Sequence, residues 1–235
     1  MIGSKILRFD VLESTNDFAK LNYESLDQGT IVIATKQTKG RGRNNKTWKS
    51  DQGNLYFSIV LKEDISLKRL FRYVSITSLA MVHVLDNCGI KASIKYPNDI
   101  LVNQKKIAGI LIESAGNLTN LNYVIIGVGI NVNQTSFNEL SERATSFRLE
   151  TEKQCSVDRV LLQFIHHYNM LSEAEYQNVY DDYISKSIVL GKKITYDDEE
   201  YTIRSIDMDG VINLENGLMK KRVVMNEISL EELYD

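Results

Sequence analysis

The sequence predicts an α+β protein in which a mixed β-sheet is flanked by helices and followed by a small C-terminal β-barrel. Strand-like and helical segments follow one another in the order βαββαβββ and then α, without the regular alternation of a parallel fold. The composition changes near Ser187, after which short alternating runs are separated by closely spaced turn residues. We therefore expect a main domain at 1–186, with its helices on one face of the sheet, and a second domain at 187–235.

Hydrophobic periodicity and capping residues define the elements of the first half. Ser14-Thr15-Asn16-Asp17 offers N-cap side chains to a helix, and Gly89 is a natural residue to end one. The expected elements are a strand at 5–12, a helix from Ser14 to about Glu24, a strand at 30–36, a polar loop at 37–53, a strand at 54–62 and a helix from Ser66 to Gly89.

The second half contains shorter elements. We expect a strand, a corner and a hairpin over 93–113, with the hairpin turning at 103–106. A further strand covers 122–133, and a helical stretch covers 157–185. Turn residues such as Asp209-Gly210 then punctuate the β-rich C-terminal region.

Composition narrows the class of protein. The 235 residues are 43% hydrophobic, which is ample for a core, and the net charge of −3 gives no global basic field for nucleic acid. Cys88 and Cys155 lack the spacing of a zinc site or a disulfide framework, which fits a reducing compartment. No apolar run approaches the ~20 residues that span a bilayer. We expect a cytoplasmic protein.

A cationic loop begins at Gly40-Arg41-Gly42-Arg43 and ends at Trp48, the single tryptophan of the chain. The glycines allow a backbone turn whose N–H groups bind an anion, and the arginines add planar forks for a carboxylate or a phosphate. The indole offers a flat face to an adenine or another ring. The alternatives are a solvated basic loop with one half-buried tryptophan, or a local nucleic-acid patch.

The single proline lies in the corner Lys95-Tyr96-Pro97-Asn98-Asp99. Proline fixes the backbone and ends the strand, so that Asn98 and Asp99 can point out of the sheet end. Asp99 is an oxygen ligand suited to Mg²⁺, which needs few protein carboxylates when a nucleotide supplies the rest. The alternative is an ordinary Pro-Asn-Asp turn.

Two glycine-containing strands follow the corner. In Lys105-Lys106-Ile107-Ala108-Gly109, a lysine at the mouth of a strand can reach a ligand, and the glycine leaves room for a ring. The alternative is a hairpin with exposed lysines. Gly127-Val128-Gly129-Ile130-Asn131 is no dinucleotide fingerprint, because Val132 takes the place of the third glycine and no helix opens there. These glycines indicate close contact with a flat ligand.

Taken together, these segments resemble the biotin protein ligase family, in the family's order and at its approximate spacings. The resemblance is carried over residues 5–135 by Ser14-Thr15-Asn16, Gln37, Gly40-Arg41-Gly42-Arg43, Trp48, Lys95-Tyr96-Pro97-Asn98-Asp99, Lys106-Ile107-Ala108-Gly109-Ile110-Leu111-Ile112-Glu113 and Gly127-Val128-Gly129-Ile130-Asn131. It implies a class II synthetase-like catalytic fold, a C-terminal SH3-like barrel, and ATP-dependent biotin–protein ligation through biotinyl-5′-AMP.

The resemblance also implies a role for each matching residue. Lys106 and Arg43 would be catalytic, and Asp99 would lie at the metal. Biotin would be bound by Ser14, Thr15, Asn16, Gln37, Gly40, Arg41, Gly42, Arg43, Lys106, Gly109 and Gly127. ATP and the adenylate would be bound by Arg43, Lys46, Trp48, Lys95, Asn98 and Asn131.

Two positions depart from the family pattern. Asn45-Lys46 stands where the family often has a second Gly-Arg pair, so the bidentate fork of that arginine is lost. Tyr96 stands where the family more often has tryptophan. The resemblance further implies biotin, ATP and Mg²⁺ as substrates and cofactor, a biotin carboxyl carrier protein as partner, and a possible homodimer. The chain begins directly in the catalytic strand, so we expect no DNA binding of its own.

Two other functions stay open on the sequence. A lipoate or octanoate transferase would share a related fold, although the loop and the corner favour biotin. A non-catalytic biotin sensor would not need Lys106, Arg43 and Asp99, the residues suited to phosphate chemistry.

Overall fold

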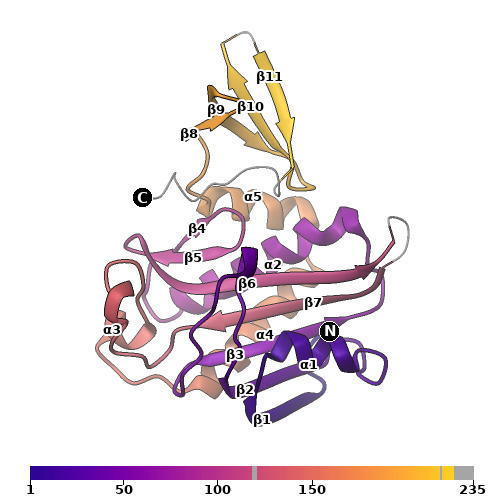
Figure 1. Ribbon diagram of the computed structural model, residues 1–235, viewed down its shortest axis with the longest axis vertical. Coiled ribbons are helices and arrows are strands. Elements are labelled where there is room, and N and C mark those ends of the chain that lie inside the picture. The colour runs from indigo at the N-terminus through magenta and orange to yellow at the C-terminus, as the bar shows by residue number, and fades with distance from the viewer. Residues whose placement is uncertain (118–120, 218, 225–235) are drawn as a thin grey trace.

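The mixed sheet predicted from the sequence is present. The structure is a computed structural model that describes residues 1–117, 121–217 and 219–224. Within these residues, a seven-stranded sheet has the order β1-β2-β3-β7-β6-β5-β4 (Figure 1). β1 runs parallel to β2, and the other neighbouring strands pair antiparallel. The strands are β1 (Ile6–Leu12), β2 (Ile31–Gln37), β3 (Leu55–Leu61), β4 (Ser93–Lys95), β5 (Asp99–Val102), β6 (Lys105–Gly116) and β7 (Leu121–Ile130).

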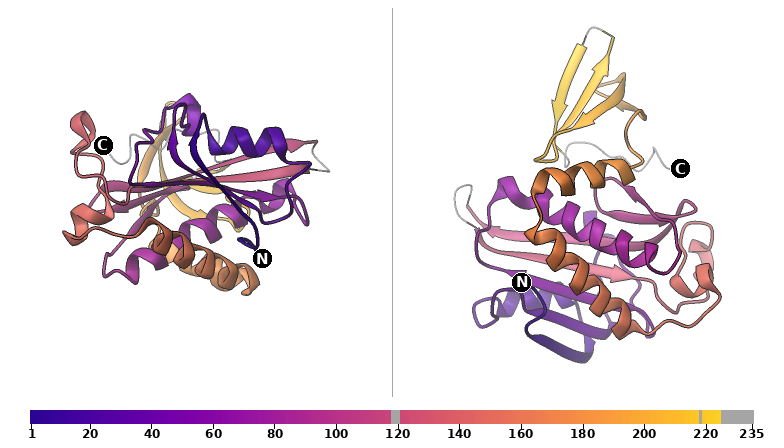
Figure 2. Two further views of the ribbon diagram at one scale, coloured as in Figure 1. Left: turned by 90° about the horizontal axis from the view of Figure 1, so that it is seen from below. Right: turned by 180° about the vertical axis from the view of Figure 1, so that it is seen from behind.

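The helices cover both faces of this sheet, which corrects the expectation that they share one face (Figure 2). β3 is buried along its whole length, so each face needs an apolar cover. The long helices α2 and α4 pack together over one face, while Ala19 of α1 packs against Val32 and Val60 on the other. The α-helices are α1 (Thr15–Asn22), α2 (Leu70–Asp86), α3 (Phe147–Thr151), α4 (Val157–Glu173) and α5 (Tyr176–Lys186), and the 3₁₀-helices are η1 (Arg43–Asn45), η2 (Leu67–Arg69) and η3 (Asn138–Leu140). Among the described helices, none is long and apolar enough to cross a membrane.

One expected helix is two. The stretch predicted at 157–185 is interrupted at Ala174, where the backbone is extended with φ −70° and ψ 156°. No glycine or proline marks this break, so local propensity could not reveal it. By contrast, Gly89 lies close to its predicted place: α2 ends at Asp86, and Gly89 closes the following turn with a positive φ of 74° and with its amide donating to Asp86 O.

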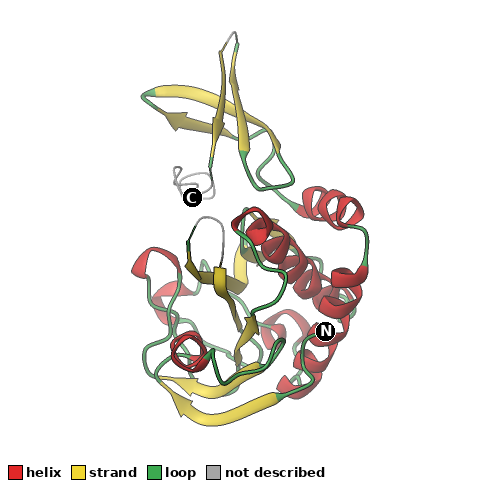
Figure 3. Cartoon of the chain, turned by 90° about the vertical axis from the view of Figure 1, so that its right-hand side faces the viewer, coloured by secondary structure: helices red, strands yellow, loops and turns green. Residues whose placement is uncertain are grey.

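The C-terminal region forms a separate antiparallel sheet beyond α5 (Figure 3). Among the described residues its four strands have the order β11-β10-β9-β8. They are β8 (Lys193–Tyr196), β9 (Glu199–Ile206), β10 (Ile212–Asn216) and β11 (Met219–Val223). Part of the barrel expected at 187–235, namely 218 and 225–235, lies outside the described residues.

Tyrosine hydroxyls dock one turn of this small sheet onto the main body. Tyr96 donates to Gly210 O at 2.7 Å, and Tyr176 donates to Met208 O at 3.1 Å. Tyr180 of α5 donates to the carbonyl of Ile206. Burial raises the pKa of the Tyr96 hydroxyl, which therefore keeps its proton as a donor. The turn between β9 and β10 thus lies directly beside the corner that carries Asn98 and Asp99.

Candidate active site

A strip free of large side chains runs across the face of the sheet that α1 covers. Alternate residues of a strand point to the same face, and the strip combines Ser58 of β3, Gly127 and Gly129 of β7, and Gly109 of β6. Ser58 lies opposite Gly127, and Gly129 lies opposite Gly109. This arrangement lets flat groups lie directly against the backbone of three adjacent strands, and the side chains of Asn16 and Trp48 do so.

The N-terminus of α1 brings four of the residues predicted to bind biotin, namely Ser14, Thr15, Asn16 and Gln37, together at this strip. Ser14 caps the helix, and its hydroxyl accepts from the Asp17 amide. The Thr15 amide donates to Gln37 Oε1 at 2.8 Å. The side chains of Ser14, Thr15 and Asn16 are all at least nine-tenths buried. The cluster therefore offers ordered donors and acceptors within an otherwise apolar layer.

Gly127 is required for the position of Asn16. A methyl group on Gly127 would lie 2.2 Å from Asn16 Oδ1, closer than atoms can approach. The Asn16 carbonyl oxygen accepts from the Ser58 hydroxyl at 2.5 Å, and its amide nitrogen donates to Glu113 Oε2 at 2.8 Å. A larger residue at 127 would displace an amide that is held on both sides.

The predicted cationic loop crosses the same face, passing in front of β7 and β6 (Figure 1). Gly40 is buried, and a methyl group there would lie 2.4 Å from Ser50 Oγ. The loop closes on itself where the Gly42 amide donates to Lys46 O at 2.7 Å. Local packing thus demands glycine at 40, while the segment that follows carries the arginines over the strip.

Trp48 lies directly on the glycine pair of β6 and β7. A methyl group on Gly129 would lie 2.6 Å from the indole Cε2, and one on Gly109 would lie 2.9 Å from Cζ3. Within the described residues, the indole Nε1 is buried without a hydrogen-bond partner. A buried donor with no acceptor costs free energy, so a ligand that offers one would be favoured here.

The charged residues of the loop, corner and β6 converge beside the indole. Arg43 Nη1 donates to Asn98 Oδ1 at 3.2 Å. Lys106 Nζ lies 2.7 Å from Asp99 Oδ1 and 5.1 Å from the centre of the Trp48 ring. A guanidinium, an amine and a carboxylate, predicted separately from three motifs, therefore share one site.

Arg41 contacts carboxylates on two elements. It pairs with Glu113 of β6 and, at 3.2 Å, with Asp17 of α1. Lys20 Nζ lies 2.9 Å from the same Glu113 oxygen that accepts from Arg41. Burial would raise the pKa of Glu113, but hydrogen bonds from Lys20 and Asn16 outweigh burial and lower this pKa. Glu113 is therefore ionised at neutral pH.

The remaining predicted residues are placed less centrally. Asn131 is buried, and its amide donates to Thr145 O at 3.0 Å, which fixes the segment after β7. Lys46 is exposed on the loop, and Lys95 ends β4 opposite Asp99 in the sheet register. The adenine and phosphate contacts expected of these three residues stay predictions.

Sequence reasoning missed several residues that hold this site together. Ser58 is fully buried in the strand Leu55–Leu61, and a lone hydroxyl in such an apolar strand was the available signal. Glu113 was part of a motif but received no role. Asp17 and Lys20 have no sequence signal beyond their i, i+3 spacing, because their site partners come from distant strands and loops.

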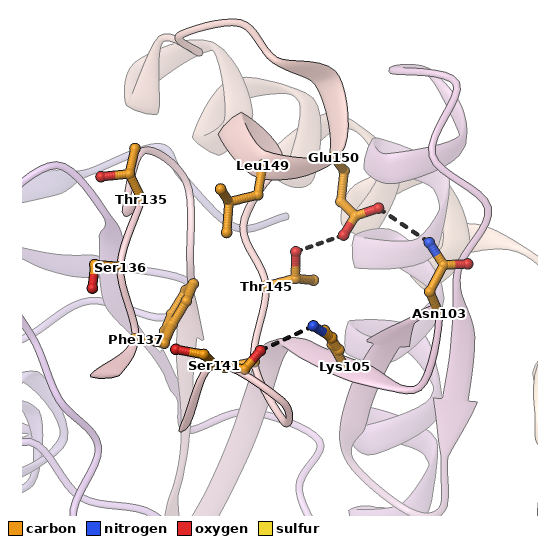
Figure 4. Close-up of a pocket in the computed structure, with 10 residues that line it drawn as sticks. Asn103, Lys105, Thr135, Ser136, Phe137, Ser141, Thr145, Leu149 and Glu150 are labelled. Atoms are coloured by element: carbon orange, nitrogen blue, oxygen red, sulfur yellow. Dashed lines mark hydrogen bonds between the residues drawn. The ribbon is translucent and has the colours of Figure 1, made fainter. Parts of the chain in front are cut away.

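A cavity of about 380 Å³ lies beside the start of β6, next to this site (Figure 4). Glu150 accepts there from the Thr145 hydroxyl at 2.5 Å and from the Asn103 amide at 3.3 Å. Lys105 Nζ donates to Ser141 O at 3.0 Å across the same opening. Among the described residues, none of those predicted to bind biotin or ATP lines this cavity. The candidate site is therefore defined by the side chains that converge beside Trp48.

Comparison with known proteins places the chain in a family. Residues 8–131 match the model of the biotin/lipoate A/B protein ligase family. These residues make up more than half of the chain and include the loop, the corner and both glycine strands. The chain belongs to the biotin/lipoate A/B protein ligase family.

Individual relatives agree with this assignment. The bifunctional ligase/repressor BirA of Bacillus subtilis is 40% identical over 152 residues, which cover 62% of this chain and 47% of that protein. A biotin–acetyl-CoA-carboxylase ligase of Paracoccus denitrificans is 34% identical over 123 residues, covering 51% of each. The structure of the Aquifex aeolicus biotin protein ligase in complex with biotin and ATP superposes with a TM-score of 0.80 at 26% identity, covering 97% of this chain and 98% of that one. The chain spans about half the length of the Bacillus and Paracoccus relatives.

Proposed function

We propose that this protein is an ATP-dependent biotin–protein ligase. The observation that carries the proposal is the convergence of Arg43, Lys106 and Asp99 at one end of a glycine strip whose other end holds the buried amide of Asn16 and the half-buried amide of Gln37. One end suits an anion and a phosphate, and the other suits a polar ring. The similarity to a ligase bound to biotin and ATP supports the same conclusion.

The reaction has two steps. The biotin carboxylate attacks the α-phosphorus of ATP, a new P–O bond forms, and the bond to pyrophosphate breaks, giving biotinyl-5′-AMP. The amine of a carrier lysine then attacks the acyl carbon and loses a proton, and AMP leaves. The lysine belongs to a biotin carboxyl carrier protein or domain, in keeping with the name of the Paracoccus relative.

Each predicted residue has a place in this scheme. Lys106 neutralises the charge that grows on the α-phosphoryl oxygens, a preorganised stabilisation of the kind that usually dominates catalysis. Arg41 and Arg43 hold the carboxylate and then the adenylate. Gly40 and Gly42 shape the loop that closes over it and limits hydrolysis. Ser14, Thr15, Asn16, Gln37, Gly109 and Gly127 bind biotin, and Lys46, Trp48, Lys95, Asn98 and Asn131 bind the nucleotide.

The residues fit a magnesium ion that arrives with the nucleotide. In the described part of the chain, no group of three His, Cys, Asp or Glu side chains could hold a metal ion. Asp99 is a single carboxylate at the phosphate end, and Mg²⁺ there would keep phosphate oxygens and waters as its other ligands.

Both described cysteines are free, which agrees with a cytoplasmic location. A homodimer through the sheet is part of the same proposal.

Transfer to a carrier tests the function directly. We expect incubation with biotin, Mg-ATP and a biotin carboxyl carrier domain to add the mass of one biotinyl group to the intact carrier. A parallel reaction with lipoate should give no mass gain, because the amides of Asn16 and Gln37 suit a ureido ring and not a dithiolane. Modification by lipoate alone would assign the chain to the other branch of its family.

We further propose that 187–235 is a separate SH3-like module that supports the corner at Lys95–Asp99. The donor role of Tyr96 is the support for this proposal, because its buried hydroxyl reaches Gly210 from the residue next to Pro97. Removing one partner of a buried hydrogen bond costs roughly 1–3 kcal/mol.

Tyr96→Phe should therefore lower the free energy of unfolding by about 1–3 kcal/mol in a denaturant titration and also reduce the rate of adenylation. The matched control is Tyr180→Phe, which removes a donor from α5 to Ile206, the last residue of β9 before the same turn. That variant should lose stability and keep its adenylation rate. Equal rates in the two variants would mean that the docked turn does not support the corner.

A further inference from the structure

The carboxylate of Glu113 connects three elements of the site. Its Oε2 accepts from Asn16 Nδ2 at 2.8 Å. Its Oε1 accepts from Lys20 Nζ at 2.9 Å and from the guanidinium of Arg41. One half-buried side chain on β6 is thus bonded to the amide at the start of α1, to the next turn of that helix, and to the cationic loop.

This arrangement fixes the orientation of Asn16. An ionised carboxylate only accepts hydrogen bonds, so it must face the NH₂ group of the amide and not its oxygen. The oxygen is then turned toward Ser58 and the glycine strip, where its second lone pair can accept from a ring N–H of a ligand. A neutral side chain at 113 would leave both orientations of the amide open.

The same carboxylate holds the loop. Arg41 lies at the first turn of the loop and pairs with Glu113 and with Asp17. The side chain of Glu113 is 21% exposed and that of Arg41 is 41% exposed, so the pair is partly shielded from solvent. A charge-assisted contact at this depth restrains the loop more than a fully exposed pair would.

We propose that Glu113 is a positioning residue that couples ring recognition by Asn16 to closure of the cationic loop through Arg41. This inference rests on the proposed function. Glu113 touches neither the reacting carboxylate nor the phosphate in this scheme. Its loss should therefore weaken biotin binding and loosen the loop, with a smaller effect on the chemical step at saturating biotin.

The test compares Glu113→Gln with Glu215→Gln. Glu215 makes a similar pair with Arg204 at 2.6 Å and is 27% exposed, but it lies in the C-terminal sheet. For Glu113→Gln we expect the biotin Kd, measured by calorimetry, to rise about tenfold, as for the loss of a hydrogen bond to a charged group. Trypsin should cleave the loop between Lys39 and Lys49 faster, and kcat for biotin-dependent pyrophosphate release should change less than threefold. Glu215→Gln should match the wild type in all three measurements.

Asp17→Asn provides a second, more exposed variant in case Glu113→Gln does not fold. It removes the other carboxylate that pairs with Arg41, so loop cleavage should rise while the Asn16 contact is kept. Unchanged biotin binding and unchanged loop cleavage in Glu113→Gln would overturn the proposal, as would a loss confined to kcat. If Glu113→Gln does not fold, unchanged cleavage in Asp17→Asn overturns it. Failure of the wild type to bind biotin would instead overturn the proposed function.

Discussion

Replacing Lys106 with alanine is expected to slow adenylation by a factor of roughly 10²–10³, the usual cost of removing one preorganised transition-state donor. The amine lies 2.7 Å from Asp99 at the end of the site that suits an anion. Charge on the α-phosphoryl oxygens develops only as the reaction proceeds, so the biotin Kd should change less than about fivefold, the equivalent of one ordinary hydrogen bond. Pyrophosphate release and calorimetry measure the two quantities.

Lys105→Ala is the matched control for this result. The neighbouring lysine lies on the same strand, but its amine donates to Ser141 O in the cavity that Glu150 also lines (Figure 4). That variant should adenylate biotin at the wild-type rate. Equal losses of binding and of rate in Lys106→Ala would reduce its role to binding.

Replacing Arg43 with glycine is expected to release the adenylate. The guanidinium is anchored on Asn98 at 3.2 Å, and the variant would lose the charge-assisted contact to phosphate that we propose for it. Its loss should increase the escape of biotinyl-5′-AMP about tenfold. The free anhydride then labels lysines of a bystander protein such as albumin, which mass spectrometry detects in reactions that contain no carrier.

Lys39→Gly controls for a glycine placed in the same loop. Its amine forms an exposed pair with Glu13 at 2.9 Å, outside the site. Bystander labelling by this variant should equal that of the wild type. If Arg43→Gly labelled no more bystander protein than this control, the proposed role of Arg43 in retaining the adenylate would be wrong.

The sequence was sufficient where a signal is local. Long periodic segments predicted the central strands and α2, and the unusual loop and corner motifs predicted the residues that converge beside Trp48. The helix that forms α1 was predicted, but not the face of the sheet that it covers, because that face depends on the packing of Ala19 against Val32 and Val60 of distant strands. The break at Ala174 was missed because tertiary contacts of Tyr176 and Tyr180 favour it, and no local residue signals it.

Contacts between distant residues explain the rest. Glu113 meets Asn16 across 97 positions of the chain, and Tyr96 meets Gly210 across 114. Neither pairing has a periodicity or a spacing that a single sequence displays. The residues that bind were therefore easier to predict than the residues that hold them in position.

The structure brings Arg43 and Lys106 together beside Asn98 and Asp99, and it places Arg41 on Glu113 of β6. We expect biotin to be activated between these three cations. A crystal structure with biotin and a non-hydrolysable ATP analogue tests it most directly. We expect the ring to lie beside Asn16, and the biotin carboxylate to lie within hydrogen-bond reach of Arg41 or Arg43 and to face the α-phosphate next to Lys106. Biotin bound away from these three cations would contradict it.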